Sequence, residues 1–244
     1  LEYVNNYVIM NDFVGNYRCE FFQNGRRCLP TLCGWRIPLV PFWRWRHLKF
    51  WIATFPSKSD TIDKAAWECL AYELAVKSGI EMSSCRIERI MGNYNTFFTK
   101  RFDRENGKRI HFASAMTMTG NNEDIIRDNQ PSYLEIAEFI SNYGVNIEKN
   151  LHQLWRRIIF NIAISNTDDH LRNHGFILTN EGWILSPAYD LNPSIDKDGL
   201  SLNIDMDNNE LDFDLAKSVG NYVSLDDKQM NSIIEEVNSV VRGW

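Results

Sequence analysis

The 244-residue chain carries 26 basic and 32 acidic side chains, for a formal net charge of −6, and 44% of its residues are hydrophobic. This composition is typical of a folded globular protein with enough apolar residues for a large core. The acidic balance argues against a surface that binds nucleic acid throughout, but it leaves room for a local basic patch.

The cysteines predict a reducing environment. Their number is odd, no C-x-x-C spacing occurs, and all lie in the N-terminal part of the sequence: Cys19, Cys28, Cys33, Cys69 and Cys85. These features favour free thiols over a disulfide framework. No apolar run reaches the roughly 18 residues of a membrane span, and no basic segment leads into an apolar one at the N-terminus. We therefore expect a cytoplasmic protein that contacts no membrane.

The N-terminal region contains the least usual stretch of the chain. After a possible strand at residues 3–10, residues 21–59 hold seven basic side chains, no acidic one and four of the eight tryptophans. Such a segment could bind nucleic acid by stacking and phosphate contacts, lie on an anionic membrane, or cover a core with long side chains. We favour the third, structural interpretation.

Three elements are predicted next along the chain. Residues 51–57 read as a strand that Pro56 ends. Residues 62–78 show helical periodicity, and Gly79 would stop the helix. Residues 85–90 and 96–102 flank Gly92-Asn93 and are typical of a β-hairpin. The polar stretch that follows Met116, up to Asn129, is expected to be a loop.

The second half of the sequence is predicted to be mainly helical. Ser132 and Glu135 have the spacing of a capping box before a helix that ends at Gly144. Residues 147–164 form the most apolar helical pattern, and an amphipathic helix is predicted at 225–241. Residues 196–214 hold seven acidic side chains, but the calcium-loop spacing is not met, so a solvated loop or a helix start is favoured.

One polar run carries the chemistry. Residues 166–175 contain two Asp, two Asn, two His and one Arg, which predicts a loop. The apolar segments 176–178 and 183–185 then form a short hairpin, which would return Asp190 to the neighbourhood of Asn173. Asp168 and Asn173 have the D-x-x-x-x-N spacing of a kinase catalytic loop, with Asp190 in the place of the metal-binding aspartate.

These residue types suit phosphoryl transfer. Oxygen ligands such as Asn173 and Asp190 bind Mg²⁺, while Asp168 would orient the attacking hydroxyl and accept its proton. A surface loop of turn residues and helix caps is the simpler alternative. A metal hydrolase using His170 and His174, with Asp168, Asp169 and Asp190 nearby, is a weaker one, because glycine follows directly and the glutamate of H-E-x-x-H is absent.

The run N-T-D-D-H-x-x-N-H-G-F-x-L, followed by S-P-A-Y-D-L-N-P, resembles the signature of HipA-like serine/threonine kinases, the toxins of bacterial toxin–antitoxin systems. W-I-A-T-F-P-S at 51–57 is similar to the family's W-I-A-K-F-P-S strand. The resemblance implies an α/β (α+β), two-lobed protein-kinase-like fold. The expected lobes are a small β-rich N-lobe, residues 1–102, and a mainly helical C-lobe, residues 103–244.

The resemblance also implies a function. It implies ATP- and Mg²⁺-dependent phosphorylation of a Ser or Thr in a protein substrate. It implies a DNA-binding antitoxin as partner, so that contact with nucleic acid is indirect. Catalysis falls to Asp168 and the metal ligands are Asn173 and Asp190. Positions implied to contact ATP, or to support the loop that does so, are Thr54, Lys100, Arg101, Phe102, His170 and Tyr189.

Two departures from the family pattern leave a pseudokinase, acting as a binding module for an antitoxin or another protein, as the alternative. Thr54 stands where the family has a lysine that contacts ATP phosphates, so a positive charge is missing. Glu68 would be that lysine's helix partner, or is an ordinary solvated residue. The family's phosphate loop, G-G-A-R-P-K-A, is only faintly similar to residues 33–38. A further interpretation treats residues 28–50 as an altered segment of a degenerating gene.

Overall fold

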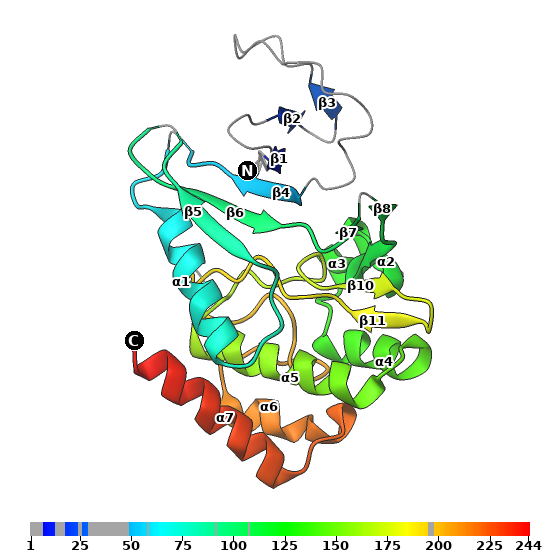
Figure 1. Ribbon diagram of the computed structural model, residues 1–244. Coiled ribbons are helices and arrows are strands. Elements are labelled where there is room, and N and C mark those ends of the chain that lie inside the picture. Colours follow the sequence, from blue (N-terminus) through cyan, green and yellow to red (C-terminus); the bar gives the residue numbers. More distant parts are fainter. Residues whose placement is uncertain are drawn as a thin grey trace. The chain divides into compact units, whose positions relative to one another are not determined.

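The computed structural model describes residues 7–12, 18–23, 26–28, 49–57, 59–90, 92–106, 108–194 and 198–244, with side chains from residue 50 onward. The chain divides into two compact units. Helix α1 (Lys64–Lys77) begins in the first unit and ends in the second (Figure 1). The units consist of Leu1–Cys69 with Ser83–Arg109, and of Leu70–Met82 with Ile110–Trp244.

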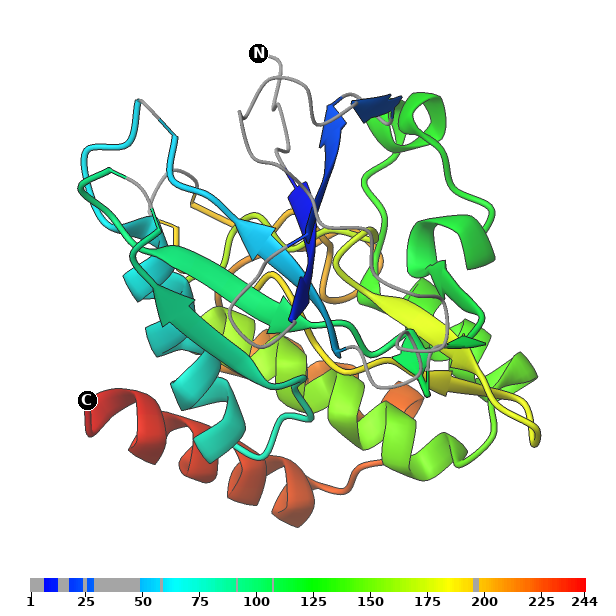
Figure 2. The ribbon, with the colours of Figure 1, turned by 45° about the horizontal axis from the view of Figure 1, so that its top comes forward.

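The first unit is built on a six-stranded antiparallel sheet with the strand order β3-β2-β1-β4-β6-β5. Figure 2 shows β4, β6 and β5 side by side. The strands are β1 (Tyr7–Asp12), β2 (Arg18–Gln23), β3 (Arg26–Cys28), β4 (Lys49–Thr54), β5 (Cys85–Glu88) and β6 (Thr96–Lys100). A small ribbon of β7 (Arg104–Glu105) and β8 (Lys108–Arg109) follows.

Most sequence predictions for this unit are confirmed. The predicted hairpin is the β5–β6 pair, with Cys85 opposite Thr99, and the predicted strand at 51–57 corresponds to β4. Helix α1 ends where predicted, because Gly79 adopts a φ of +78°, a left-handed conformation that glycine reaches without strain. Among the described residues of this unit, Trp51, Ala53 and Phe98 form a buried hydrophobic cluster.

Several predictions lie partly or wholly outside the described residues. The strand predicted at 3–10 is represented by β1 from Tyr7 on. The remnant of a phosphate loop at 33–38 belongs to the part of the chain that is not described. The same holds for most of the basic, tryptophan-rich segment 21–59 and of the segment 28–50, so neither interpretation of these residues is tested.

The second unit is mainly helical. Helices α6 and α7 lie along α5 (Figure 1). A three-stranded antiparallel sheet has the order β11-β10-β9. The helices are α2 (Ala115–Met118), α3 (Glu123–Asp128), α4 (Tyr133–Tyr143), α5 (Ile147–Ala163), α6 (Phe213–Ser218), the 3₁₀ helix η3 (Gly220–Val223) and α7 (Asp227–Arg242). The strands are β9 (Phe112–Ser114), β10 (Gly175–Leu178) and β11 (Trp183–Leu185).

Helix α5 is the centre of the core of the second unit. Leu154, Trp155 and Ile159 are fully buried, and the indole Nε1 of Trp155 donates to the carbonyl of Ala216 at 3.1 Å. The predicted capping box before α4 is present, with Ser132 and Glu135 each bonded to the other's backbone N–H. The helices predicted at 132–144, 147–164 and 225–241 and the hairpin β10–β11 are therefore confirmed.

The prediction of a loop from Met116 to Asn129 is wrong, because this stretch contains the end of α2 and all of α3; strand β9, which was not predicted, lies just before it. These elements are too short for a periodic pattern, and local caps hold them instead. The Oγ of Ser114 accepts from the N–H of Thr117, and the Oδ1 of Asn122 accepts from the N–H groups of Asp124 and Ile125.

Strand β10 begins at a glycine for a steric reason. A Cβ on Gly175 would lie 2.4 Å from Cε2 of Phe112 and 2.9 Å from the carbonyl oxygen of Ala113, both on the neighbouring strand β9. Any larger residue would push β9 away from β10. Since β10 follows the polar loop directly, this close contact fixes where the loop ends.

The acidic segment after residue 196 serves local structure, as the favoured interpretation predicts. The Oδ1 of Asp205 accepts from the N–H groups of Asp207 and Asn208, and Asp212 caps α6 through the N–H of Asp214. Residues 195–197 lie outside the described part. Among the helices that the structure describes, none has both the length and the apolar composition that crossing a bilayer requires.

Candidate active site

The polar run forms a loop between α5 and β10, as predicted. Turns hold its backbone: the N–H of Asn166 donates to the carbonyl of Asn161 at 2.9 Å, and the N–H of Asn173 donates to the carbonyl of His170 at 2.8 Å. Ser165 takes a left-handed φ of +54° at the end of α5. The N–H of Ser194 donates to the carbonyl of Ser165 at 2.9 Å, which joins the loop to the segment after β11.

The two consecutive aspartates of the loop have opposite environments. Asp168 is exposed, whereas Asp169 is 1% exposed. The Oδ2 of Asp169 accepts hydrogen bonds from the hydroxyl of Tyr133 at 2.5 Å and from Nδ2 of Asn161 at 2.7 Å. Nε2 of His174 lies 2.8 Å from the same oxygen. Elements α4, α5 and the start of β10 therefore converge on one buried carboxylate.

Electrostatics keep this carboxylate ionised. Burial alone would raise the pKa of Asp169, but the charge and hydrogen bond of His174 and the hydrogen bond of Tyr133 outweigh it, and the pKa lies below its ordinary value. The pKa of Tyr133 is raised well above its ordinary value by burial and by the adjacent Asp169. Tyr133 thus remains a donor, and the loop is fixed by a buried negative charge.

The sequence pattern did not single out Tyr133 or Asn161 as part of the site, and it placed Asp169 only in the weaker metal-hydrolase alternative. Tyr133 directly follows the capping serine of its helix, and Asn161 lies within the apolar pattern of α5. A polar residue that interrupts the apolar face of a helix just before a functional loop is the signal that could have found Asn161.

The candidate metal ligands lie on the loop and after β11. The Nδ2 of the buried Asn173 donates to the carbonyl of Asp168 at 3.4 Å, which leaves the amide oxygen as the atom available for a ligand. Asp190 has a φ of +59°, which is strained for a residue other than glycine, and its Oδ1 accepts from Nδ2 of Asn192 at 3.0 Å.

Asp190 shares an electrostatic neighbourhood with the loop. It is exposed by surface area, yet the protein around its carboxylate limits hydration, and this burial raises its pKa. Asp168 and Asp169 raise the pKa further, while His170 and the hydrogen bond from Asn192 act in the opposite direction. The structure therefore brings a third carboxylate close enough to feel the two in the loop.

Tyr189 ties these two segments together. Its hydroxyl donates to the carbonyl of Arg172 at 2.7 Å, and its ring meets Phe112 edge-on at 6.3 Å between centroids. Nη1 of Arg172 in turn lies 2.7 Å from Oε1 of Glu123 on α3. The ring nitrogen Nδ1 of His170 is buried and has no hydrogen-bond partner among the described residues.

The other predicted nucleotide residues belong to the first unit. Thr54 is exposed at the end of β4, opposite Phe97, and Lys100 is exposed at the end of β6. The backbone N–H of Lys100 donates to the carbonyl of Ser84, and the N–H of the next residue donates to that of Phe50, each at 2.8 Å. Both N–H groups are thus used within the sheet.

The side chain of Arg101 is also engaged. Its Nε and Nη2 donate to the two carboxylate oxygens of Asp103 at 2.7 and 2.5 Å, and Arg104 contacts the same carboxylate. Burial would raise the pKa of Asp103, but the two arginines lower it overall. The R-F-D-R segment is therefore a turn held by its own charges.

The histidine-based alternative finds no helix to support it. Residues 170–174 form turns, so His170 and His174 do not share a helical face, and His174 is bonded to Asp169. Within the described ranges, no group of three or more His, Cys, Asp or Glu side chains is arranged to hold a metal ion.

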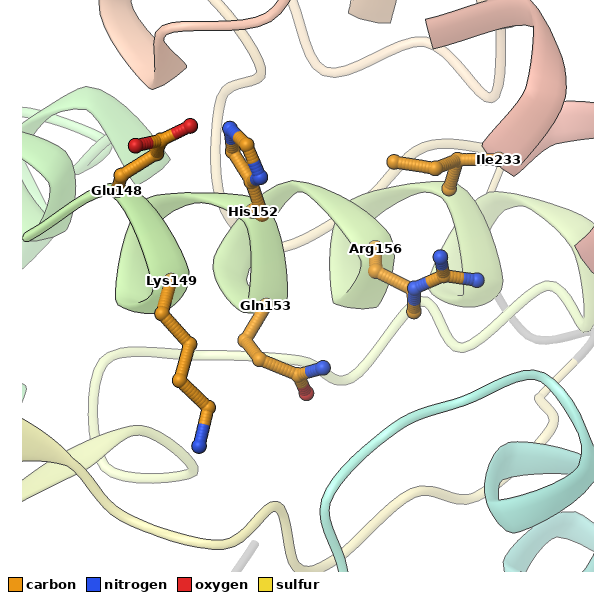
Figure 3. A pocket seen from close by; sticks show the side chains of 6 residues that line it. All are labelled: Glu148, Lys149, His152, Gln153, Arg156 and Ile233. Atoms are coloured by element: carbon orange, nitrogen blue, oxygen red, sulfur yellow. The ribbon is translucent and has the colours of Figure 1, made fainter. Parts of the chain in front are cut away.

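The second unit also has a surface pocket of ≈ 400 Å³, shown in Figure 3. Its two basic side chains are paired within the chain: Nζ of Lys149 lies 2.7 Å from Oε1 of Glu81, and Nη1 of Arg156 lies 2.8 Å from Oε2 of Glu236. None of the predicted site residues lines it. The lining residues are Glu148, Lys149, His152, Gln153, Arg156 and Ile233.

The two units and the loop together define the fold class. A β-rich unit and a helical unit, with a polar loop between a buried helix and a hairpin, constitute a two-lobed protein-kinase-like α/β fold. The chain belongs to the HipA-like C-terminal domain family, whose sequence model matches residues 44–244. The predictions of the family and of the fold class are both confirmed.

Comparison with individual proteins agrees with this assignment. The chain is 35% identical over 101 residues to a putative kinase of Haemophilus influenzae, an alignment covering 38% of this chain and 29% of that protein. It matches a chain of the HipA, HipB and operator DNA complex of the Shewanella oneidensis MR-1 toxin–antitoxin system with a TM-score of 0.63 and 19% identity, over 78% of this chain and 50% of that chain.

A second solved structure, the proinflammatory kinase CtkA of Helicobacter pylori, matches with a TM-score of 0.54 and 11% identity, over 80% of this chain and 86% of that chain. At these identities the two structural matches show the fold alone. The aligned chain spans half the length of the Shewanella protein and 29% of the Haemophilus one.

Proposed function

We propose that this chain is an ATP- and Mg²⁺-dependent protein kinase that phosphorylates a Ser or Thr of a protein substrate. The observation that carries the proposal is the pair of aspartates in the loop. Asp169 is buried and bonded to α4 and α5, so the exposed Asp168 beside it is presented on a rigid support. Asp168 would orient the acceptor hydroxyl and take its proton.

The residues around Asp168 fit a magnesium ion. Mg²⁺ in kinases is bound by one or two protein oxygens together with substrate phosphates, so a cluster of three acidic or histidine ligands is not needed. The amide oxygen of Asn173 and the carboxylate of Asp190 supply the protein oxygens. Burial and, to a smaller extent, repulsion by Asp168 and Asp169 raise the pKa of Asp190, and a cation bound there would counteract both effects. Bound Mg²⁺ would neutralise charge on the phosphate oxygens.

The proposed nucleotide contacts take account of the backbone N–H groups that the sheet already uses. Because the N–H groups of Lys100 and Arg101 are used in the sheet, we assign recognition of the adenine edge to carbonyl groups of this segment, with the ring of Phe102 covering the base. His170 would face the phosphates, and Tyr189 would act by anchoring the loop through Arg172.

A partner is also part of the proposal. The HipA chain of Shewanella oneidensis occurs in a complex with HipB and operator DNA. We propose a DNA-binding antitoxin as the partner of this chain in the cytoplasm, so that its contact with nucleic acid is indirect.

Calorimetric titration with ATP tests the nucleotide and metal site. The chain is expected to bind ATP in the presence of Mg²⁺, and Asp190→Ala is expected to weaken this binding at least about tenfold, equivalent to about 1.4 kcal/mol. Asp207→Ala, which removes another exposed aspartate of the same unit, should bind as the wild type does. Mg²⁺-dependent binding that is undiminished in Asp190→Ala would contradict the assignment.

Thr54 favours a second candidate, a pseudokinase that binds a partner without phosphoryl transfer. If only the missing charge limits activity, Thr54→Lys is expected to raise phosphate transfer by about 10²–10³-fold, the usual effect of one electrostatic contact at such a site. The exposed end of β4 offers room for the longer side chain. Thr54→Met, similar in length but uncharged, is the control. Initial rates with labelled ATP measure the effect, and an inactive Thr54→Lys variant would favour the pseudokinase.

A further inference from the structure

Helix α5 buries three polar side chains on one face. Asn150, Arg157 and Asn161 are 7%, 1% and 0% exposed. Spacings of seven and four residues place them about two turns and one turn apart on the same side of an α-helix. Burying polar groups in a core costs free energy unless they are hydrogen-bonded, so their partners are informative.

Each of the three side chains binds a different part of the candidate site or of its support. Oδ1 of Asn150 accepts from the N–H of Leu185, the last residue of β11, at 3.2 Å. Nη2 of Arg157 donates to the carbonyl of Ser186 at 2.5 Å. Asn161 binds the loop through Asp169, as described, and its Oδ1 accepts from Nδ2 of Asn166 at 3.0 Å.

These contacts place both aspartate-bearing segments on one rigid element. Asp168 directly precedes Asp169, which Asn161 holds. Asp190 follows Ser186 by four residues, and Arg157 holds Ser186. Because Arg157 and Asn161 are one helical turn apart, the separation of the two segments is set by α5 and not by the loops themselves.

An arginine is a costly choice for this position. An apolar side chain of similar volume would usually stabilise a core as well or better. Burial lowers the pKa of Arg157 to about 10, while Asp169, Tyr189 and Glu81 act to raise it, so the guanidinium is protonated at neutral pH. Nε and Nη1 have no hydrogen-bond partner among the described residues. A buried cation with one protein hydrogen bond indicates a role beyond packing.

We propose that Arg157 is a positioning residue that holds the Ser186–Asp190 segment in register with the Asp168 loop, so that Asn173 and Asp190 reach the same metal ion. The inference rests on the proposed function. It adds to it a buried residue on α5 that acts on the metal ligand through the backbone of Ser186.

Arg157→Met and Arg157→Lys in the full chain test this inference, with Arg156→Met as the matched control. Residue 156 is also an arginine of α5, but its guanidinium binds Glu236 and the carbonyl of Ser78 at the pocket of Figure 3. Calorimetry measures the dissociation constants for ATP with saturating Mg²⁺ and for ATP with EDTA, and urea denaturation measures the stability of each variant.

Arg157→Met is expected to weaken Mg²⁺-dependent binding about 10–100-fold, the usual range for residues that orient metal ligands, and to leave metal-free ATP binding unchanged. Arg157→Lys, which restores a charged donor, should recover part of the loss. Arg156→Met should lose stability but keep its metal-dependent affinity. Equal Mg²⁺-dependent affinity in Arg157→Met and the wild type would overturn the inference, as would an equal loss in Arg156→Met.

Two further outcomes remain decisive. If Arg157→Met does not fold, the decision rests on Arg157→Lys. ATP binding that is weaker than in the wild type with Mg²⁺, but unchanged with EDTA, supports the inference. Wild-type affinity for ATP with Mg²⁺ overturns it. If the wild type binds no ATP with Mg²⁺, the proposed function fails, and hydrogen exchange of residues 186–192 decides instead. Faster exchange there in Arg157→Met than in Arg156→Met supports the positioning role, and equal exchange overturns it.

Discussion

Replacing Asp169 with alanine is expected to lower the free energy of unfolding by about 3–5 kcal/mol, the range found when one member of a buried charged group is removed. The change leaves the hydroxyl of Tyr133 and the amide of Asn161 without their shared acceptor, and it removes the negative charge that acts most strongly on the buried cation Arg157. Urea denaturation followed by tryptophan fluorescence measures the loss.

The neighbouring residue provides the control. Asp168 is exposed, so Asp168→Ala should change the free energy of unfolding by less than about 0.5 kcal/mol. The pH dependence provides a second check. The pKa of Asp169 is lowered in the folded chain, so its contribution is full above the ordinary value of 3.8 and is lost as the pH falls through the folded pKa. The wild type and Asp169→Ala should therefore converge in strong acid. A stability difference below 1 kcal/mol near neutral pH would show that the buried network is not a major support of the loop.

Asp168→Ala is expected to reduce phosphate transfer by about 10²–10⁴-fold, the usual contribution of a positioned acid or base. Fold and ATP affinity should be retained, because Asp168 is exposed and the loop is held by Asp169. Transfer of label from γ-labelled ATP to the chain itself and to casein, as a generic acceptor, measures the effect. Asp207→Ala serves as the exposed-aspartate control.

The outcome separates the two adjacent acids by function. Asp168→Ala should lose phosphate transfer and keep its free energy of unfolding. The main effect of Asp169→Ala should be a lower free energy of unfolding. Undiminished transfer by Asp168→Ala would remove this residue from the proposed mechanism and would require another base near Asp190.

The sequence predicts best those elements whose stabilising contacts are local. The capping box of Ser132 and Glu135 and the apolar stripe of α5 need no knowledge of distant residues, and both helices are found as predicted. The hairpin β10–β11 follows from two apolar segments and a turn. Strand β9 was missed because only its pairing with β10, some 60 residues away, makes it a strand.

The sequence predicts the exposed and the proposed metal-binding residues of the candidate site but not the buried residues that hold them. Residue type and spacing singled out Asp168, Asn173 and Asp190, and their proposed roles remain predictions. Burial cannot be read from two adjacent aspartates, so the different environment of Asp169 required the structure. The bond between Arg101 and Asp103 was in principle visible, since opposite charges two residues apart often pair within a turn.

The contact between β9 and β10 has a consequence for how this region diverges among relatives. The ring of Phe112 occupies the space that a side chain at position 175 would need. The glycine of the N-H-G run and the bulk of residue 112 are thus one steric constraint shared by two distant positions. A smaller residue at position 112 would remove the contact with the ring but not the one with the carbonyl of residue 113, so we expect glycine to persist at 175 as long as the sheet does.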